Sequence, residues 1–177
     1  MTSGRCALHI LFVCTGNICR SPMAERFAAA MAADAGIADF KATSAGTRAV
    51  IGHPIHTSAA RIIEESGGNA SNFGARQLNS KIASGADLIL TMTRQHRDAV
   101  LDVAPTKLHK TFTLGEAARL VAEHDAQSVS DLPALRPHLV DRNLLDILDP
   151  IGQSDEVFAE VGAHIAGLLP PIIGLCR

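Results

Sequence analysis

The fold of this chain is decided by the stretch Cys14-Thr15-Gly16-Asn17-Ile18-Cys19-Arg20-Ser21-Pro22. It follows an apolar run over residues 7–13 and precedes an alanine-rich stretch that begins at Met23. The run has the composition of a buried strand, and Pro22 favours the start of a helix. In a short loop between a strand and a helix, successive backbone N–H groups can point inward, and the N-terminus of the helix adds the positive end of its dipole. The stretch therefore predicts a binding loop for phosphate or a similar oxyanion.

The side chains of this loop indicate phosphoryl chemistry through a cysteine. A field that binds a dianion also favours a thiolate, so we expect Cys14 to be the nucleophile. Arg20 presents a planar fork of donors that matches two phosphate oxygens. We expect Gly16 to adopt a backbone conformation that a Cβ resists, and Asn17 to tolerate the left-handed region. Ser21 is expected to cap the following helix and to offer its hydroxyl to the sulfur of Cys14.

The phosphate-binding part of the loop is predicted to consist mainly of backbone N–H groups. The residues assigned to phosphate binding are Thr15, Gly16, Asn17, Ile18, Cys19 and Ser21, with Arg20 as the clamp. Two interpretations of the Cys19 side chain stay open. It packs against the sheet, or it forms a disulfide with an oxidised Cys14 and so prevents over-oxidation.

These residues resemble the active-site loop of the low-molecular-weight protein tyrosine phosphatases. Four further segments occur in that family's order: 43–47, 75–78, 87–92 and Asp149-Pro150. The resemblance extends from about Leu8 to about Ile165. It implies an enzyme that hydrolyses phosphotyrosine through a cysteinyl-phosphate intermediate and needs no metal or other cofactor.

A thiolate cannot also protonate the leaving phenolate, so the reaction needs a separate acid. Asp149 fits this role, because Pro150 fixes the loop and biases Asp149 to an extended conformation. The same carboxylate would later accept a proton from the attacking water. Asp146 is the rival and lacks the proline. The alternative for Asp149 is a purely structural turn.

Ser44 and Asn17 match family positions whose hydrogen bonds hold the loop in shape. The family usually places a histidine two residues before the Ala75-Arg76-Gln77 tripeptide, but this chain has Phe73. A buried polar group without a partner is costly. We therefore expect Asn17 to bond to backbone or to Ser44, and Phe73 to lie in an apolar pocket.

Strand-like runs alternate with helix-like stretches, which predicts an α/β fold with a parallel sheet. The expected strands are 7–13, 40–44, 86–92 and 108–113, and the expected helices are 22–33, 57–66, 94–101 and 154–168. The resemblance implies a doubly wound open sheet of four parallel strands in the order 2-1-3-4, flanked by helices. Its phosphate loop follows strand 1, at the switch point. We expect a single domain over residues 1–177, with a partly helical surface insertion around 122–148 near the mouth of the site.

Composition argues against several other classes of protein. The net charge is −2 with a pI near 6.4, so no basic field favours nucleic acid. Aromatic residues make up only 3% of the chain, which disfavours stacking on bases. His53 and His56 lack a neighbouring cysteine or carboxylate, so no metal site is expected.

The sequence also predicts a cytoplasmic location. The residues before the first strand lack the apolar region of a secretion signal. No apolar run approaches the roughly 18 residues of a membrane helix, because the segment 166–173 is short and contains two prolines. A nucleophilic Cys14 also needs a reducing compartment.

Three alternative functions would make different demands on the sequence. A thioredoxin-coupled arsenate reductase needs two relay cysteines, but no cysteine lies between Cys19 and Cys176. Protein arginine phosphatases of the same fold tend to carry threonine where Ile18 stands. A catalytically silent phosphotyrosine-binding module would not need both Cys14 and Asp149. The expected partner is a tyrosine-phosphorylated protein, with a bacterial tyrosine kinase as one candidate if the source is bacterial.

Overall fold

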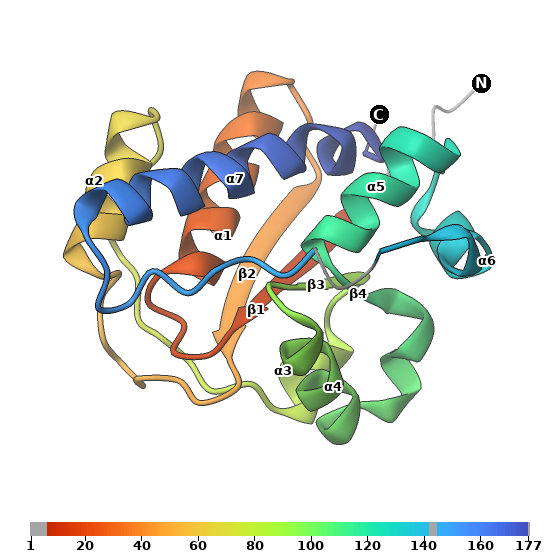
Figure 1. Ribbon diagram of the computed structural model, residues 1–177, viewed down its shortest axis with the longest axis horizontal. Helices are drawn as coiled ribbons and strands as arrows, with labels where there is room; N and C mark the ends of the chain where they lie inside the picture. Colours follow the sequence, from red (N-terminus) through yellow and green to blue (C-terminus); the bar gives the residue numbers. More distant parts are fainter. Residues whose placement is uncertain (1–6, 142–144, 177) are drawn as a thin grey trace.

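The computed structural model describes residues 7–141 and 145–176 (Figure 1). Its centre is a parallel sheet of four strands in the order β2-β1-β3-β4. The strands are β1 (Leu8–Cys14), β2 (Phe40–Gly46), β3 (Leu88–Thr91) and β4 (Thr111–Thr113). The predicted fold class and strand order are therefore confirmed.

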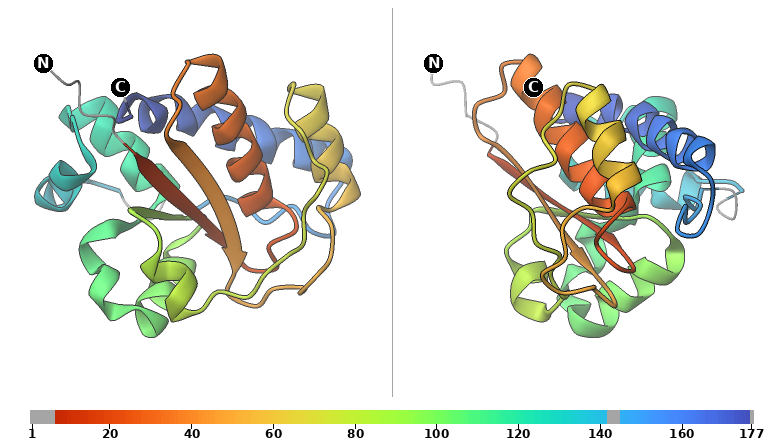
Figure 2. Two further views of the ribbon diagram at one scale, coloured as in Figure 1. Left: turned by 180° about the vertical axis from the view of Figure 1, so that it is seen from behind. Right: turned by 90° about the vertical axis from the view of Figure 1, so that its left-hand side faces the viewer.

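Helices cover both faces of the sheet (Figures 1 and 2). One face carries α1 (Arg20–Asp34), α2 (Thr57–Glu65), α5 (Leu114–His124) and α7 (Asp155–Gly174). The other face carries α3 (Ser80–Ser84) and α4 (Arg94–Val103). A short helix, α6 (Leu132–Leu135), packs beside α5. This arrangement buries the central strands on both sides.

Strand β1 shows why the site lies where it does. Its side chains alternate between two hydrophobic clusters, with Ile10 and Phe12 in one and Leu11 and Val13 in the other. All four side chains are fully buried. A strand held on both faces cannot shift its register without moving these side chains to the wrong side. Its last residue, Cys14, is thereby placed at the carboxyl end of the sheet.

Two elements differ from the prediction at the fourth strand. Residues Pro105–Lys110 form a 3-10 helix, so β4 begins only at Thr111. Helix α5 follows directly and was not predicted. It starts with a capping box, in which Thr113 and Glu116 satisfy each other's backbone N–H groups.

Helix α7 also differs from the prediction, since it continues past residue 168 to Gly174. Pro170 and Pro171 each lack an N–H donor, but Leu169 and Ile172 are fully buried in the core around them. Length and composition alone would let this helix cross a membrane. Its apolar side chains instead pack against α1, α2 and α5.

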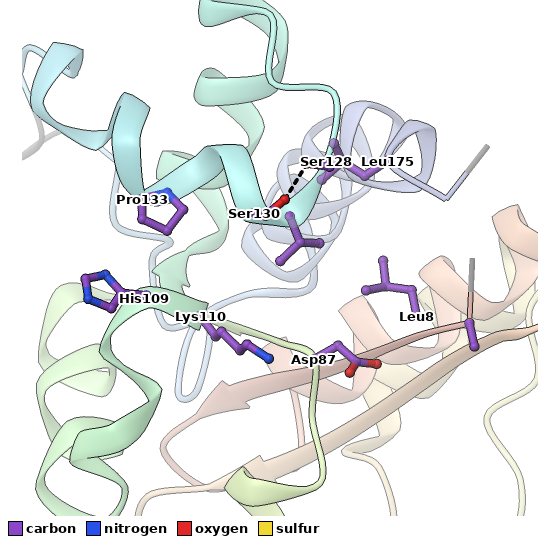
Figure 3. Close-up of a pocket in the computed structure, with 10 residues that line it drawn as sticks. Leu8, Asp87, His109, Lys110, Ser128, Ser130, Pro133 and Leu175 are labelled. Atoms are coloured by element: carbon purple, nitrogen blue, oxygen red, sulfur yellow. Dashed lines mark hydrogen bonds between the residues drawn. The ribbon is translucent and has the colours of Figure 1, made fainter. Parts of the chain in front are cut away.

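The segment around 122–148 begins inside α5 and continues through short helical turns. Ser128, Val129 and Pro133 line a cavity of about 530 Å³ together with Leu8, at the start of β1 (Figure 3). This end of β1 is opposite to Cys14. The helical part of the segment therefore lies away from the phosphate loop, whereas the carbonyl of Ile147, near its end, accepts a hydrogen bond from Arg20. The single domain with an insertion stays a prediction.

Candidate active site

The loop after β1 is held by its carbonyl groups. The carbonyls of Thr15, Gly16 and Ile18 accept hydrogen bonds of 2.9, 3.0 and 2.8 Å from backbone N–H groups in the segment 48–56. The described residues contain no cis peptide bond, so each following N–H points opposite to its carbonyl. The N–H groups of residues 16, 17 and 19 consequently point toward the centre of the loop. This orientation is the one that an oxyanion cradle requires.

Ser21 lies beside the sulfur of Cys14, but it does not cap the helix. Helix α1 begins at Arg20 and Cys19 is its N-cap, so Ser21 stands in the first helical turn. The Ser21 Oγ lies 2.9 Å from the Cys14 Sγ and accepts a 2.9 Å bond from the Asn17 side-chain amide. Because the amide donates to this hydroxyl, the hydroxyl proton can point at the sulfur. That arrangement places a hydrogen-bond donor beside the Cys14 sulfur.

The left-handed residue of the loop is Asn17, with a φ of 58°. Gly16 does not have a positive φ, and a Cβ there would make ordinary contacts of 3.6 Å. The prediction for Gly16 was therefore wrong. The glycine that the loop requires is Gly46 on β2, where a Cβ would lie 2.4 Å from the carbonyl oxygen of Thr15. The loop carbonyl occupies the space that a side chain would need.

A hydrogen-bond network supports the loop from below. The Asn17 side chain donates to the Ser44 hydroxyl at 2.9 Å and accepts from the backbone N–H of Arg76 at 2.9 Å. Ser44 in turn donates to a carboxylate oxygen of Glu25 at 3.3 Å. The expected partners of Asn17 are thus confirmed. Glu25 was missed, because an exposed helical glutamate and a buried one look alike in the sequence.

Glu25 is a partly buried acid in this network, with 13% of its side chain exposed. Burial raises the pKa of its carboxyl group, while Arg26 and the Ser44 hydroxyl act in the opposite direction. Arg26 lies 2.8 Å from this carboxylate, and its guanidinium also covers the ring of Phe73 at 5.6 Å. Phe73 is partly buried and packs against the larger hydrophobic cluster. Its surroundings are therefore apolar on one side and cationic on the other.

We expect Phe73→His to give no gain in catalytic efficiency. The new imidazole would meet the Arg26 guanidinium and apolar side chains, and the polar groups around Asn17 already have partners. Burying an unpaired ring nitrogen should instead destabilise the fold by about 1–3 kcal/mol. Urea unfolding and kcat/KM on an aryl phosphate measure both effects. A marked rise in kcat/KM would show that the loop lacks support.

Arg20 is buried, with only 4% of its surface exposed. One guanidinium nitrogen donates to the carbonyl of Ile147 at 2.8 Å, and the other lies 3.5 Å from a carboxylate oxygen of Asp149. These contacts hold the fork in place above the loop. A cavity of about 370 Å³ opens here, and its lining is Cys14, Thr15, Gly16, Ile18, Cys19, Arg20, Arg48, Val50, Asp149 and Ile151.

The two candidate acids occupy different environments. Asp149 lines the cavity, is about half exposed, and accepts a 3.1 Å hydrogen bond from the backbone N–H of Ile151. Asp146 instead accepts a 2.9 Å bond from the backbone N–H of Arg94 at the start of α4. It does not line the cavity. The geometry therefore favours Asp149 as the acid, and the turn at Ile151 orients its carboxylate.

His96 on α4 is a supporting residue that the sequence did not reveal. It is only 5% exposed, and its Nε2 is hydrogen-bonded to the Thr15 hydroxyl at 2.8 Å. Within the described part of the chain its Nδ1 is buried without a partner. Burial, and then the nearby Arg20 charge, lower the pKa of His96 to about 4. A neutral imidazole therefore supports the first residue of the loop.

This histidine predicts a loss of stability in mild acid. The unfolded chain binds the His96 proton near pH 6.5 and the folded chain near pH 4, so stability falls as pH decreases between these values. We expect the titration of His96 to lower the free energy of unfolding by about 2 kcal/mol between pH 7 and pH 5. The measurement is the free energy of unfolding in urea at several pH values. His96→Asn should flatten the profile, whereas the same substitution at the exposed His53 should not.

Cys19 lines the cavity but is a poor nucleophile. It is 3% exposed, and burial, with nearby Cys14 and Asp149, raises the pKa of its thiol to about 12. The thiol form therefore predominates at neutral pH, which favours the packing interpretation. Over residues 7–141 and 145–176, no group of three or more histidine, cysteine or acidic side chains could hold a metal ion.

Comparison with known proteins places the chain in a family. The sequence model of the low molecular weight phosphotyrosine protein phosphatases matches residues 9–131. The low molecular weight protein-tyrosine-phosphatase Etp of Escherichia coli is 36% identical over 107 residues, which cover 60% of this chain and 69% of that protein. The chain therefore belongs to the low molecular weight phosphotyrosine protein phosphatase family.

Solved structures agree with this assignment. The low molecular weight protein tyrosine phosphatase from T. tengcongensis superposes with a TM-score of 0.76 at 32% identity, covering 94% of this chain and 97% of that one. The arginine phosphatase YwlE from Geobacillus stearothermophilus superposes with a TM-score of 0.72 at 28% identity, covering 94% and 90%. The fold thus occurs with both activities.

Proposed function

We propose that this protein is a phosphatase that hydrolyses phosphotyrosine in proteins through a phosphate bound to Cys14. The observation that carries the proposal is one cavity whose lining includes Cys14, Arg20 and Asp149. A nucleophile, an anion clamp and an acid are the groups that phosphoryl transfer to a thiol requires. Because both the nucleophile and the acid are present, a silent binding module is the weaker alternative.

The reaction would proceed in two steps. The Cys14 thiolate attacks phosphorus in line, and the bond to the tyrosine oxygen breaks as Asp149 protonates that oxygen. Loop N–H groups and Arg20 hold the equatorial oxygens. Water then attacks the phosphorus and gives a proton to the Asp149 carboxylate, while the sulfur–phosphorus bond breaks. The Ser21 hydroxyl, 2.9 Å from the sulfur, stabilises the departing thiolate.

Arginine phosphatase activity is the second candidate, because an arginine phosphatase is among the similar structures. The side chain that favours phosphotyrosine is Ile18, which lines the cavity above the loop. An aliphatic side chain suits the carbon face of a phenyl ring, whereas a phosphoarginine guanidinium would prefer a hydrogen-bond acceptor there.

Initial rates on matched phosphotyrosine, phosphoserine and phosphoarginine peptides test this proposal. We expect kcat/KM to be highest for phosphotyrosine. A preference for phosphoarginine would make the second candidate correct, and no turnover of any peptide would contradict a phosphatase function.

Asp149→Ala should slow the hydrolysis of aryl phosphates by a factor that depends on the leaving group. A general acid contributes about 10²–10⁴-fold, and its contribution shrinks when the leaving phenolate is a weak base. We therefore expect a large loss of kcat/KM, which reports on the first step, for phenyl phosphate and a small one for an activated nitrophenyl ester. Asp146→Ala is the matched control. Equal losses for all esters would assign Asp149 to structure.

We also propose a cellular location and a class of protein substrate. A nucleophilic cysteine suits a reducing compartment, so we place the protein in the cytoplasm. The substrate is then a tyrosine-phosphorylated protein, for which a bacterial tyrosine kinase is the candidate partner. Phosphotyrosine analysis of cells lacking the protein tests this, and a kinase whose phosphorylation is unchanged would be excluded as a substrate.

A further inference from the structure

A second cavity lies beside the one that contains Cys14. Its volume is about 350 Å³, and it is lined by Thr15, Thr47, Arg48, Gln95, His96 and Ala99. Thr15 and Arg48 also line the cavity of the phosphate loop. The two cavities therefore adjoin at the mouth of the site, with Arg48 between them.

Arg48 is a cation without a counterion. Its backbone N–H donates to the carbonyl of Thr15 at 2.9 Å, which fixes its position against the phosphate loop. Its exposed guanidinium makes no hydrogen bond or ion pair with any described residue. Arg26 and Arg97, by contrast, each pair with a glutamate. No carboxylate lines the second cavity, so the Arg48 charge is available to an anion.

The other polar side chains of this cavity are available too. The Thr47 hydroxyl and the exposed Gln95 amide have no hydrogen-bond partner in residues 7–141 and 145–176. They could donate to an anion that the Arg48 fork binds through two oxygens. The lining of the first cavity also includes two aliphatic side chains, Val50 and Ile151. The aliphatic and the polar lining residues therefore favour different parts of a substrate.

We propose that this second cavity binds the carboxylate of an aspartate or glutamate next to the phosphotyrosine of the substrate. The aryl ring would contact Ile18 and Val50 while the neighbouring carboxylate meets Arg48. The preferred substrate is then an acidic phosphotyrosine segment. This inference rests on the proposed phosphotyrosine phosphatase function and specifies its substrate class.

The test compares pairs of phosphotyrosine peptides that differ only in aspartate or asparagine at positions flanking the tyrosine. At the flanking position where the two peptides differ most, we expect the wild type to prefer the aspartate peptide by about fivefold in kcat/KM at low salt. This factor is at the upper end of what an exposed ion pair contributes. Added salt should reduce this preference. Arg48→Gln should bring the ratio near one, and Arg48→Glu should reverse it. Lys41→Gln, at the far end of β2, removes an equal charge and should leave the ratio unchanged.

The outcomes separate the two proposals. If the wild type hydrolyses both peptides of every pair equally, or if Arg48→Gln retains the preference, the acidic subsite is overturned and the phosphotyrosine phosphatase function stands. An equal effect of Lys41→Gln would assign the preference to overall charge, which also overturns the subsite. If the wild type hydrolyses no phosphotyrosine peptide, the proposed function fails and the subsite fails with it.

Discussion

Cys14→Ser is expected to abolish turnover while the protein still binds phosphate or vanadate. A serine hydroxyl at this position is not ionised at neutral pH, so the attacking group of the first step is lost. The N–H groups of residues 16, 17 and 19 and the Arg20 guanidinium remain in place, because their contacts do not involve the sulfur. Steady-state kinetics and a vanadate titration measure the two properties.

The size of this effect decides between covalent and direct hydrolysis. Retention of more than about one hundredth of the wild-type kcat would contradict a cysteinyl-phosphate mechanism. Cys19→Ser is the matched control, since that thiol is buried on the same loop but is disfavoured as a thiolate. It should keep most of the activity.

Arg20→Lys should be almost as damaging, with a fall in kcat of about 10²–10³-fold. The guanidinium uses one nitrogen for the carbonyl of Ile147 and directs another toward Asp149. A lysine ammonium is a point charge and cannot make both contacts while it also holds two phosphate oxygens. The same replacement at the exposed Arg61 on α2 controls for a general arginine effect. Near-normal kinetics for Arg20→Lys would show that Arg20 is not the clamp.

Much of the fold could be predicted, because its signals are local. The apolar run before Cys14 and the loop after it are contiguous, and strand–loop–helix order follows from adjacent residues. The capping box at Thr113 and Glu116 is also a local signal, because its two residues lie three positions apart. The extension of α7 through Pro171 was not predictable in this way, because packing in the core outweighs the lost hydrogen bonds.

The residues of the candidate site also differ in whether their signals are local in the sequence. Cys14 and Arg20 share one loop, so their spacing reveals them. The role of Asp149 was inferred with the help of the family resemblance, since 134 residues lie between it and Cys14. His96, which supports Thr15 from α4, and Glu25, which supports Ser44 from α1, act only through contacts made on folding. Sequence patterns place both on helices but do not show which partners their side chains meet.

The central claim is that the phosphoryl group passes through the Cys14 sulfur, and trapping that group tests it most directly. The enzyme would be mixed rapidly with a phosphotyrosine peptide, quenched within one turnover and digested for mass spectrometry. Asp149→Ala should prolong the intermediate when an activated ester is used, because this variant lacks the base of the second step. The account predicts one phosphoryl group on the peptide that contains Cys14. Turnover without such a species, or a phosphoryl group on another residue, would contradict it.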